Sequence, residues 1–264
     1  MEALKLGSAL DTVSSLHPKP HHMKLNYGTA GFRDLAKVLD STVFRCGLIA
    51  GIRTHQCGQP VGLMITASHN PEQDNGVKMV EANGVCRLPL SAVLAACAHA
   101  KCSIPGINAK KNAGEMFAPA WEDHAAAAAN AESVGELSEV LNRVIQQEAV
   151  RPCEKAAVVL AGDTRESTPA LMQAAREGVQ LTGAEVMDIG ICTTPMLHYQ
   201  VVRTNDSKLD EYYHRLLNGF KRLTTGTWQQ HPRTFKLICC NPCRLIVLSV
   251  SGYFMCTQGS STMS

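Results

Sequence analysis

The feature that most constrains the fold is an alternation of strand, turn, helix and strand between residues 156 and 189. Residues 156–160 (AAVVL) form a short apolar run typical of a buried strand, and the polar turn Gly162-Asp163-Thr164 follows. Thr168 and Pro169 predict a helix with Thr168 as its N-cap, and Gly183 predicts its end near residue 182. The apolar run 184–189 then predicts another strand. Such an alternation is typical of α/β layer folds.

Similar signals extend toward the N-terminus. Helices are predicted at residues 38–52, 125–129 and 134–145, the last with a clear apolar face. Strands are predicted at residues 61–66 (VGLMIT) and 77–80, with the turn signal Asn75-Gly76 between them. Residues 85–113 and 224–264 do not follow this alternation.

Composition excludes several classes of protein. The 264 residues are 45% hydrophobic and 18% charged, which fits a soluble chain of one large or two small domains. The 25 Lys and Arg nearly balance the 23 Asp and Glu, so no basic footprint for nucleic acid or an anionic membrane is expected. No apolar run approaches the roughly 18 residues of a membrane span. Residues 1–16 lack the apolar core of a secretory signal, so a cytoplasmic location is expected.

Eleven cysteines are an unusual number for such a chain. An odd count without a secretory signal predicts reduced thiols. A zinc protein is one alternative, because Cys240 and Cys243 have C-x₂-C spacing. No second pair stands at a suitable distance, which makes zinc the least favoured hypothesis.

The segment with the strongest chemical signal is Thr66–Pro71 (TASHNP), followed by Asp74–Lys78 (DNGVK). It places Ser68 just after a buried strand, where reactive groups of α/β sheets are commonly exposed. An ordinary serine turn would have the same spacing. A hydrolase is disfavoured because the segment lacks the Gly-x-Ser-x-Gly pattern of a nucleophile elbow.

These two motifs resemble the phosphoserine loop of the α-D-phosphohexomutases, in particular of members that act on N-acetylglucosamine phosphates. Further segments resemble that family in the same order, namely residues 27–33 (YGTAGFR), 114–124, 162–165, 193–199 and 211–223. The resemblance covers most of residues 20–223 and leaves out 85–113.

The resemblance implies an α/β fold with a mixed sheet between helices. Residues 1–204 would form the first domain of the family, interrupted by an insertion at 85–113, and residues 205–223 would begin a second domain. Residues 224–264 would be an unrelated tail, which makes the chain an N-terminal fragment. Seven of the eleven cysteines lie in the two unmatched stretches, as expected of sequence not selected as folded protein.

The activity implied by the resemblance is the interconversion of N-acetylglucosamine 6-phosphate and 1-phosphate through a phosphoserine and a bisphosphate intermediate. Ser68 would carry the phosphoryl group and bind Mg²⁺, while Arg33 and Lys78 would stabilise phosphate charge. His69 would donate to the phosphate or transfer a proton. The other residues expected to bind substrate or phosphate are Gly28, Thr29, Gly31 and Asn70.

The chain also departs from the family pattern. The Asp-x-Asp-x-Asp loop that completes the Mg²⁺ site in the family is absent, and Ala161–Arg165 (AGDTR) lacks one basic residue of the family's GRDTR. Asp163 and Arg165 are expected either to pair as a structural clasp or to serve the site. An alternative function therefore remains, that of a non-catalytic fragment that binds a phosphosugar or another subunit.

Overall fold

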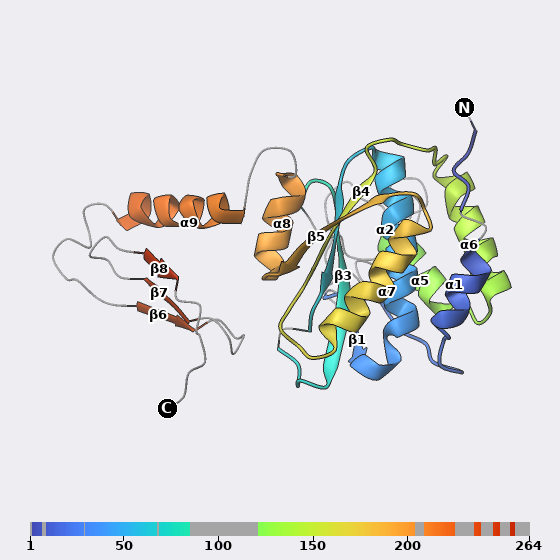
Figure 1. Cartoon of the computed structure of the whole chain (residues 1–264), viewed down its shortest axis with the longest axis horizontal. Coiled ribbons are helices and arrows are strands. Elements are labelled where there is room, and N and C mark those ends of the chain that lie inside the picture. Colours follow the sequence, from blue (N-terminus) through green and yellow to red (C-terminus); the bar gives the residue numbers. More distant parts are fainter. Residues whose placement is uncertain are drawn as a thin grey trace, which may run out of the picture. The chain divides into compact units, whose positions relative to one another are not determined.

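Figure 1 shows the computed structural model of the chain, which divides into two compact units, Met1–Thr204 and Asn205–Ser264. The structure describes residues 2–6, 9–28, 30–67, 69–84, 121–203, 209–224, 235–238, 245–248 and 254–256. Thr29, Ser68, the segment 85–113 and the Cys240–Cys243 pair lie outside the described residues.

The first unit is built on a five-stranded sheet in the order β1-β3-β2-β4-β5. Its strands are β1 (Phe32–Leu35), β2 (Val61–Ile65), β3 (Asp74–Val80), β4 (Ala157–Gly162) and β5 (Glu185–Ile191). Strand β3 pairs antiparallel with β1 and β2, whereas β2, β4 and β5 run parallel. The prediction of a mixed sheet in an α/β fold is confirmed.

Helices cover both faces of this sheet (Figure 1). The helices of this unit are α1 (Leu10–Leu16), the 3₁₀ turn η1 (Ala36–Val38), α2 (Asp40–Cys57), α5 (Trp121–Asn130), α6 (Val134–Gln147), α7 (Thr168–Gln180) and α8 (Thr194–Val202). Helices α2 and α7 pack together on one face, with α5 behind α2, and α8 packs on β2 and β4. The contact of α8 is close, since a Cβ on Gly62 would lie 2.7 Å from Val201 Cγ2.

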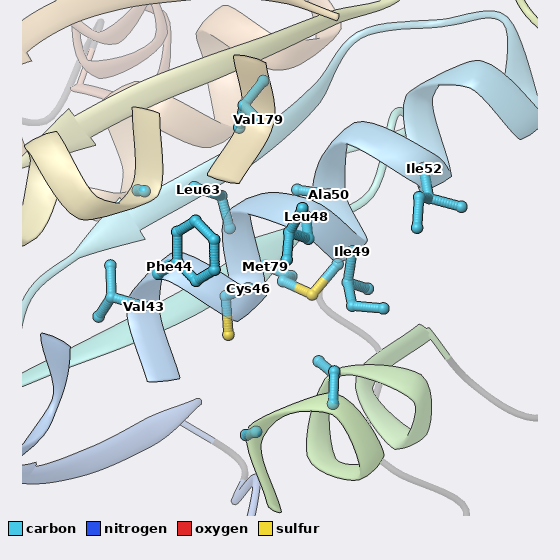
Figure 2. Close-up of a cluster of buried hydrophobic side chains, with 14 of the residues drawn as sticks. Val43, Phe44, Cys46, Leu48, Ile49, Ala50, Ile52, Leu63, Met79 and Val179 are labelled. Atoms are coloured by element: carbon cyan, nitrogen blue, oxygen red, sulfur yellow. The ribbon is translucent and has the colours of Figure 1, made fainter. Parts of the chain in front are cut away.

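Two glycines allow the backbones of α2 and α7 to come into direct contact. A Cβ on Gly47 would lie 2.2 Å from the Ala175 carbonyl oxygen, and one on Gly178 would lie 2.0 Å from that of Phe44. Figure 2 shows buried apolar side chains around α2, among them Val179 of α7, Leu63 of β2 and Met79 of β3. Phe44 and Leu63 are fully buried there. The helix predicted at residues 38–52 therefore corresponds to α2, which is the inner helix of the domain.

Alternate residues of β2 and β3 face opposite sides of the sheet, as the period of two requires. Leu63 and Val77 belong to the core beneath α2. Met64 and Lys78 are register partners on the opposite face. Arg33 is the partner of Gly76 and shares that face, which places two cations on the side of the sheet that α8 covers.

Two local predictions are wrong. Asn75 and Gly76 do not form a turn but lie within β3, where Gly76 is paired with Arg33. Thr168 is the first residue of α7, and Ser167 is the N-cap, because the Thr168 hydroxyl is bonded to Asp163 instead.

The second unit contains α9 (Leu209–Thr224), which includes the segment 211–223. It also contains a separate antiparallel sheet of β6 (Phe235–Ile238), β7 (Leu245–Leu248) and β8 (Phe254–Cys256). These strands lie in the stretch 224–264, which does not follow the alternation of strand, turn and helix seen earlier in the sequence. Among the described helices of both units, none has the length and apolarity needed to cross a membrane.

Candidate functional site and family

The candidate site is the β2–β3 loop, residues 66–73, at the end of the central strand β2. Backbone hydrogen bonds fold it back on itself. The Thr66 amide donates to the Gly76 carbonyl at 3.0 Å, the Asn70 amide to Ala67 at 2.7 Å, and the Asp74 amide to Pro71 at 3.1 Å. The residues described on both sides of Ser68 therefore form a compact, hydrogen-bonded loop.

Arg33 reaches this loop from β1. Its Nη1 donates to Asn70 Oδ1 at 3.3 Å, and Asn70 Nδ2 donates to Asp74 Oδ2 at 2.9 Å. Arg33 Nε is buried and has no acceptor among the described residues. The structure thus brings Arg33 to Asn70, which is two positions from Ser68 in the sequence, and leaves the buried Nε donor of Arg33 without a described acceptor.

Gly76 makes the approach of Arg33 possible. A Cβ at this position would lie 2.4 Å from the Phe32 carbonyl oxygen and 3.0 Å from Arg33 Cγ. The Asn-Gly pair therefore serves close strand packing rather than a change of chain direction.

Lys78 lies farther along β3 on the same face as Arg33, and it is half-buried. The nearby His198 of α8 donates from Nδ1 to the Gly84 carbonyl at 2.8 Å. Burial lowers the pKa of His198, the Gly84 carbonyl opposes that shift, and the positive charge of Lys78 lowers the pKa further. Lys78 therefore contributes positive potential on the face that α8 covers.

The turn that contains Gly28 and Gly31 is held by reciprocal hydrogen bonds. The Gly28 amide donates to Gly31 at 3.2 Å, and the Gly31 amide donates to Gly28 at 3.0 Å. Gly31 has φ +85°, and a Cβ there would lie 2.2 Å from the Val77 carbonyl oxygen, so only glycine fits against β3. These two amides serve the turn in this structure, and their role at a phosphate stays a prediction.

Asp163, at the end of β4, is the centre of a buried polar cluster. It is 7% exposed and accepts hydrogen bonds from the hydroxyl groups of Thr66 at 2.8 Å and Thr168 at 2.9 Å. Asn75 Nδ2 donates to Ser167 Oγ at 2.9 Å and to Thr168 Oγ1 at 3.2 Å. The cluster fastens both ends of the β2–β3 loop to β4 and α7.

Arg165 extends this cluster to the loop backbone. Its Nε donates to Asp163 Oδ2 at 3.0 Å, which confirms the expected pairing of these two residues. Its Nη atoms donate to the carbonyl oxygens of Asn70, Pro71 and Asp74 at 3.0, 2.5 and 3.0 Å. The roles of Arg165 and Asn75 in holding the loop were not predicted, although both belong to motifs that the sequence singles out.

The remaining candidates have less structural support. His69 is exposed on the loop. Ser68 and Thr29 lie outside the described residues. Gly162 stands where the family pattern has a basic residue, and a Cβ there would lie 2.2 Å from Thr168 Cγ2, so a larger side chain would require Thr168 to shift.

The described residues do not fit a magnesium ion by themselves. In the described part of the chain, no group of three or more His, Cys, Asp and Glu could hold a metal ion. Both carboxylate oxygens of Asp163 accept hydrogen bonds from protein donors, and Asp74 Oδ2 accepts one from Asn70. Mg²⁺ prefers carboxylate and phosphate oxygens with several waters, and no described cluster supplies that set.

Comparison with known proteins places this loop in a family. Residues 48–92 and 122–209 match the family described as phosphoglucomutase/phosphomannomutase, α/β/α domain I. The human phosphoacetylglucosamine mutase is 38% identical over 241 residues, which are 88% of this chain and 39% of that protein. The chain thus spans about two fifths of the length of the relatives it matches.

Solved structures agree with the sequence match. An N-acetylglucosamine-phosphate mutase of the α-D-phosphohexomutase superfamily, in a substrate complex, has a TM-score of 0.65 and 34% identity, covering 82% of this chain and 37% of that one. The Aspergillus fumigatus N-acetylphosphoglucosamine mutase, in complex with GlcNAc-6P and magnesium, has a TM-score of 0.63 and 31% identity, covering 83% and 37%. The predicted resemblance is confirmed. The chain belongs to the phosphoglucomutase/phosphomannomutase family, through that family's α/β/α domain I.

Proposed function

We propose that this chain carries the phosphoserine loop of a phosphoacetylglucosamine mutase. Its reaction would be the interconversion of N-acetylglucosamine 6-phosphate and 1-phosphate, with Ser68 as the phosphoryl carrier. The observation that carries the proposal is the arrangement around the β2–β3 loop, where Arg33 is bonded to Asn70 and keeps a buried Nε donor. A guanidinium with a spare donor beside such a loop is suited to a phosphate oxygen.

The transfer needs little from the protein beyond positioning and positive charge. In the forward step, a sugar hydroxyl oxygen attacks the phosphorus on Ser68, the bond from phosphorus to the serine oxygen breaks, and the hydroxyl proton passes to a base. A hexose bisphosphate results. In the return step the serine oxygen, which took up a proton in the forward step, loses it to a base and attacks the other phosphorus of that bisphosphate. The bond from that phosphorus to the sugar oxygen breaks, and the sugar oxygen takes up a proton as the isomeric sugar monophosphate leaves.

Three residues have proposed roles in these steps. Arg33 holds phosphate oxygens through its planar guanidinium. Lys78 supplies a point charge from the same face of the sheet. His69, exposed on the loop, donates to the phosphate or exchanges the proton.

No step is assigned to a magnesium ion. The phosphate on Ser68 would offer one ligand, and the described residues supply no cluster to complete the site. We infer that a magnesium ion bound to this loop takes its other ligands from waters, substrate or residues outside the described part.

The second candidate function is a non-catalytic domain that binds a phosphosugar or another subunit. It is favoured by the described residues, among which no group of three or more His, Cys, Asp and Glu could hold a metal ion. A cytoplasmic location is proposed for either function, because an odd number of cysteines fits a reducing compartment, and Cys46, Cys57, Cys153 and Cys192 are free.

One assay separates the two functions. The purified chain is given Mg²⁺, glucose 1,6-bisphosphate and N-acetylglucosamine 6-phosphate, and formation of the 1-phosphate is measured. Product above that of a Ser68→Ala control supports the mutase function. Product equal to that control, together with measurable binding of the sugar phosphate, supports the non-catalytic domain.

A further inference from the structure

Arg165 donates three hydrogen bonds to the backbone of the β2–β3 loop and the start of β3. Its guanidinium bridges the carbonyl oxygens of Asn70, Pro71 and Asp74. Its side chain is only 11% exposed, so these bonds are largely shielded from water. Carbonyl groups that point toward one place repel each other, and a cation between them removes that repulsion.

Arg165 is itself held rigidly. Asp163 accepts hydrogen bonds from both the Arg165 Nε and the Arg165 backbone amide, at 3.0 and 3.1 Å. Asp163 is anchored to the sheet through its own amide, which donates to the Ile65 carbonyl at 3.0 Å. The same carboxylate accepts the Thr66 hydroxyl at the first residue of the loop. The pair therefore connects the loop to the ends of β2 and β4.

We propose that Arg165, held by Asp163, is a positioning residue that fixes the conformation of the loop in which Ser68 lies. Its observed contacts are to the loop backbone, so it would act through the presentation of Ser68. The consequence for catalysis rests on the proposed function, whereas the ordering of the loop does not. A lysine could not replace it, because one ammonium cannot reach three carbonyls and a carboxylate with a planar set of donors.

The test is amide hydrogen exchange on the full chain, comparing wild type with Arg165→Ala. The amides of Thr66, Asn70 and Asp74 donate within the loop and report on its order. We expect them to exchange about tenfold faster or more in Arg165→Ala, because several charge-assisted bonds are lost. Exchange in α6, which is remote from the loop, should stay at the wild-type rate.

A matched control and a rescue make the result specific. Arg176 forms an ion pair with Asp188 at 2.5 Å on the same β–α–β unit and does not contact the loop, so Arg176→Ala should leave loop exchange unchanged. Millimolar guanidinium added to Arg165→Ala should restore loop protection, which a general loss of stability would not allow. If Arg165→Ala does not fold, Arg165→Lys replaces it, with accelerated loop exchange again expected.

Two measurements keep this inference distinct from the proposed function. Wild-type loop exchange in a folded Arg165→Ala or Arg165→Lys chain overturns the positioning role. Phosphorylation of Ser68 by glucose 1,6-bisphosphate, followed by mass spectrometry in wild type, tests the proposed function separately. If wild type is phosphorylated, Arg165→Ala should react at least about tenfold more slowly and recover with guanidinium.

Discussion

The core beneath α2 and α7 and the β2–β3 loop are stabilised by different forces. In the core, apolar side chains such as Phe44 and Leu63 are fully buried, and Gly47 and Gly178 bring two helix backbones into contact. In the loop, order depends on a few directional bonds to charged or polar groups, chiefly those of Asp163 and Arg165. The loop can therefore lose its order while the core stays folded, which suits its proposed role as the acceptor of a phosphoryl group.

Helix α7 takes part in both regions. Its first residue, Thr168, is bonded to Asp163 in the loop cluster, while Gly178 near its end contacts α2. Substitutions at the two ends of one helix should thus have effects of different size and kind.

The largest effect is expected from Gly178→Ala, which adds a methyl group 2.0 Å from the Phe44 carbonyl oxygen. Because both atoms belong to backbones, the helices must separate, and we expect a loss of about 3 kcal/mol in the free energy of unfolding. Urea denaturation measures it. The control is Gly135→Ala on exposed α6, where the nearest atom would be 3.8 Å away and a gain of about 0.5–1 kcal/mol is expected. Equal effects of the two substitutions would mean that α2 and α7 do not touch.

A smaller effect is expected from Thr168→Val, which removes the hydroxyl between Asp163 and Asn75 without changing side-chain shape. The loss in the free energy of unfolding should be about 1–2 kcal/mol, because two buried polar groups lose a partner. The increase in amide exchange rate should be larger for the loop than for the core. Ser138→Ala on α6, which lies outside the cluster, serves as control and should leave exchange of the loop amides unchanged, and an identical response in Thr168→Val would contradict the cluster.

The smallest effect is a dependence of stability on pH that arises in the core rather than the loop. His55 donates from Nε2 to the Thr182 carbonyl at 2.8 Å and accepts the Cys153 amide at Nδ1 at 3.0 Å, an arrangement that requires the neutral ring. Burial lowers its pKa, although the Thr182 carbonyl opposes the shift. The unfolded chain therefore takes up the proton more readily, and stability is lost as pH falls below about 6.5.

The measurement is the urea midpoint between pH 7.5 and 5.5. His55→Gln should be less stable at the upper pH and should show a weaker decline with acid than wild type, while exposed His21→Gln should keep the wild-type slope. An unchanged slope in His55→Gln would mean that His55 does not cause the pH dependence of stability.

Apolar runs and helical spacing predicted four of the five strands of the sheet and helices α2, α5, α6 and α7, but not β1, α1 or α8. Runs such as residues 61–66 and 156–160 became β2 and β4 because fully buried strands are continuously apolar. The segment Thr66–Pro71 was identified by its motif, and its position at the end of β2 followed from the same pattern.

Contacts between distant segments were beyond the reach of the sequence. Arg165 lies 95 positions from Asn70, and no local spacing indicates that its guanidinium meets that carbonyl. The Asn75-Gly76 pair failed as a turn signal for a related reason. Local propensity favours a turn, whereas the close approach of Phe32 and Arg33 on the neighbouring strand requires a glycine within β3.

The central claim, that this loop accepts a phosphoryl group on Ser68, is tested most directly by mass spectrometry of the chain after incubation with glucose 1,6-bisphosphate and Mg²⁺. We expect one added phosphate, which fragmentation localises to Ser68 and which is absent from Ser68→Ala. Arg33→Met should be phosphorylated more slowly, since it removes the guanidinium that is bonded to Asn70. A folded wild-type chain that gains no phosphate, or gains it equally when Ser68 is replaced, would contradict the claim.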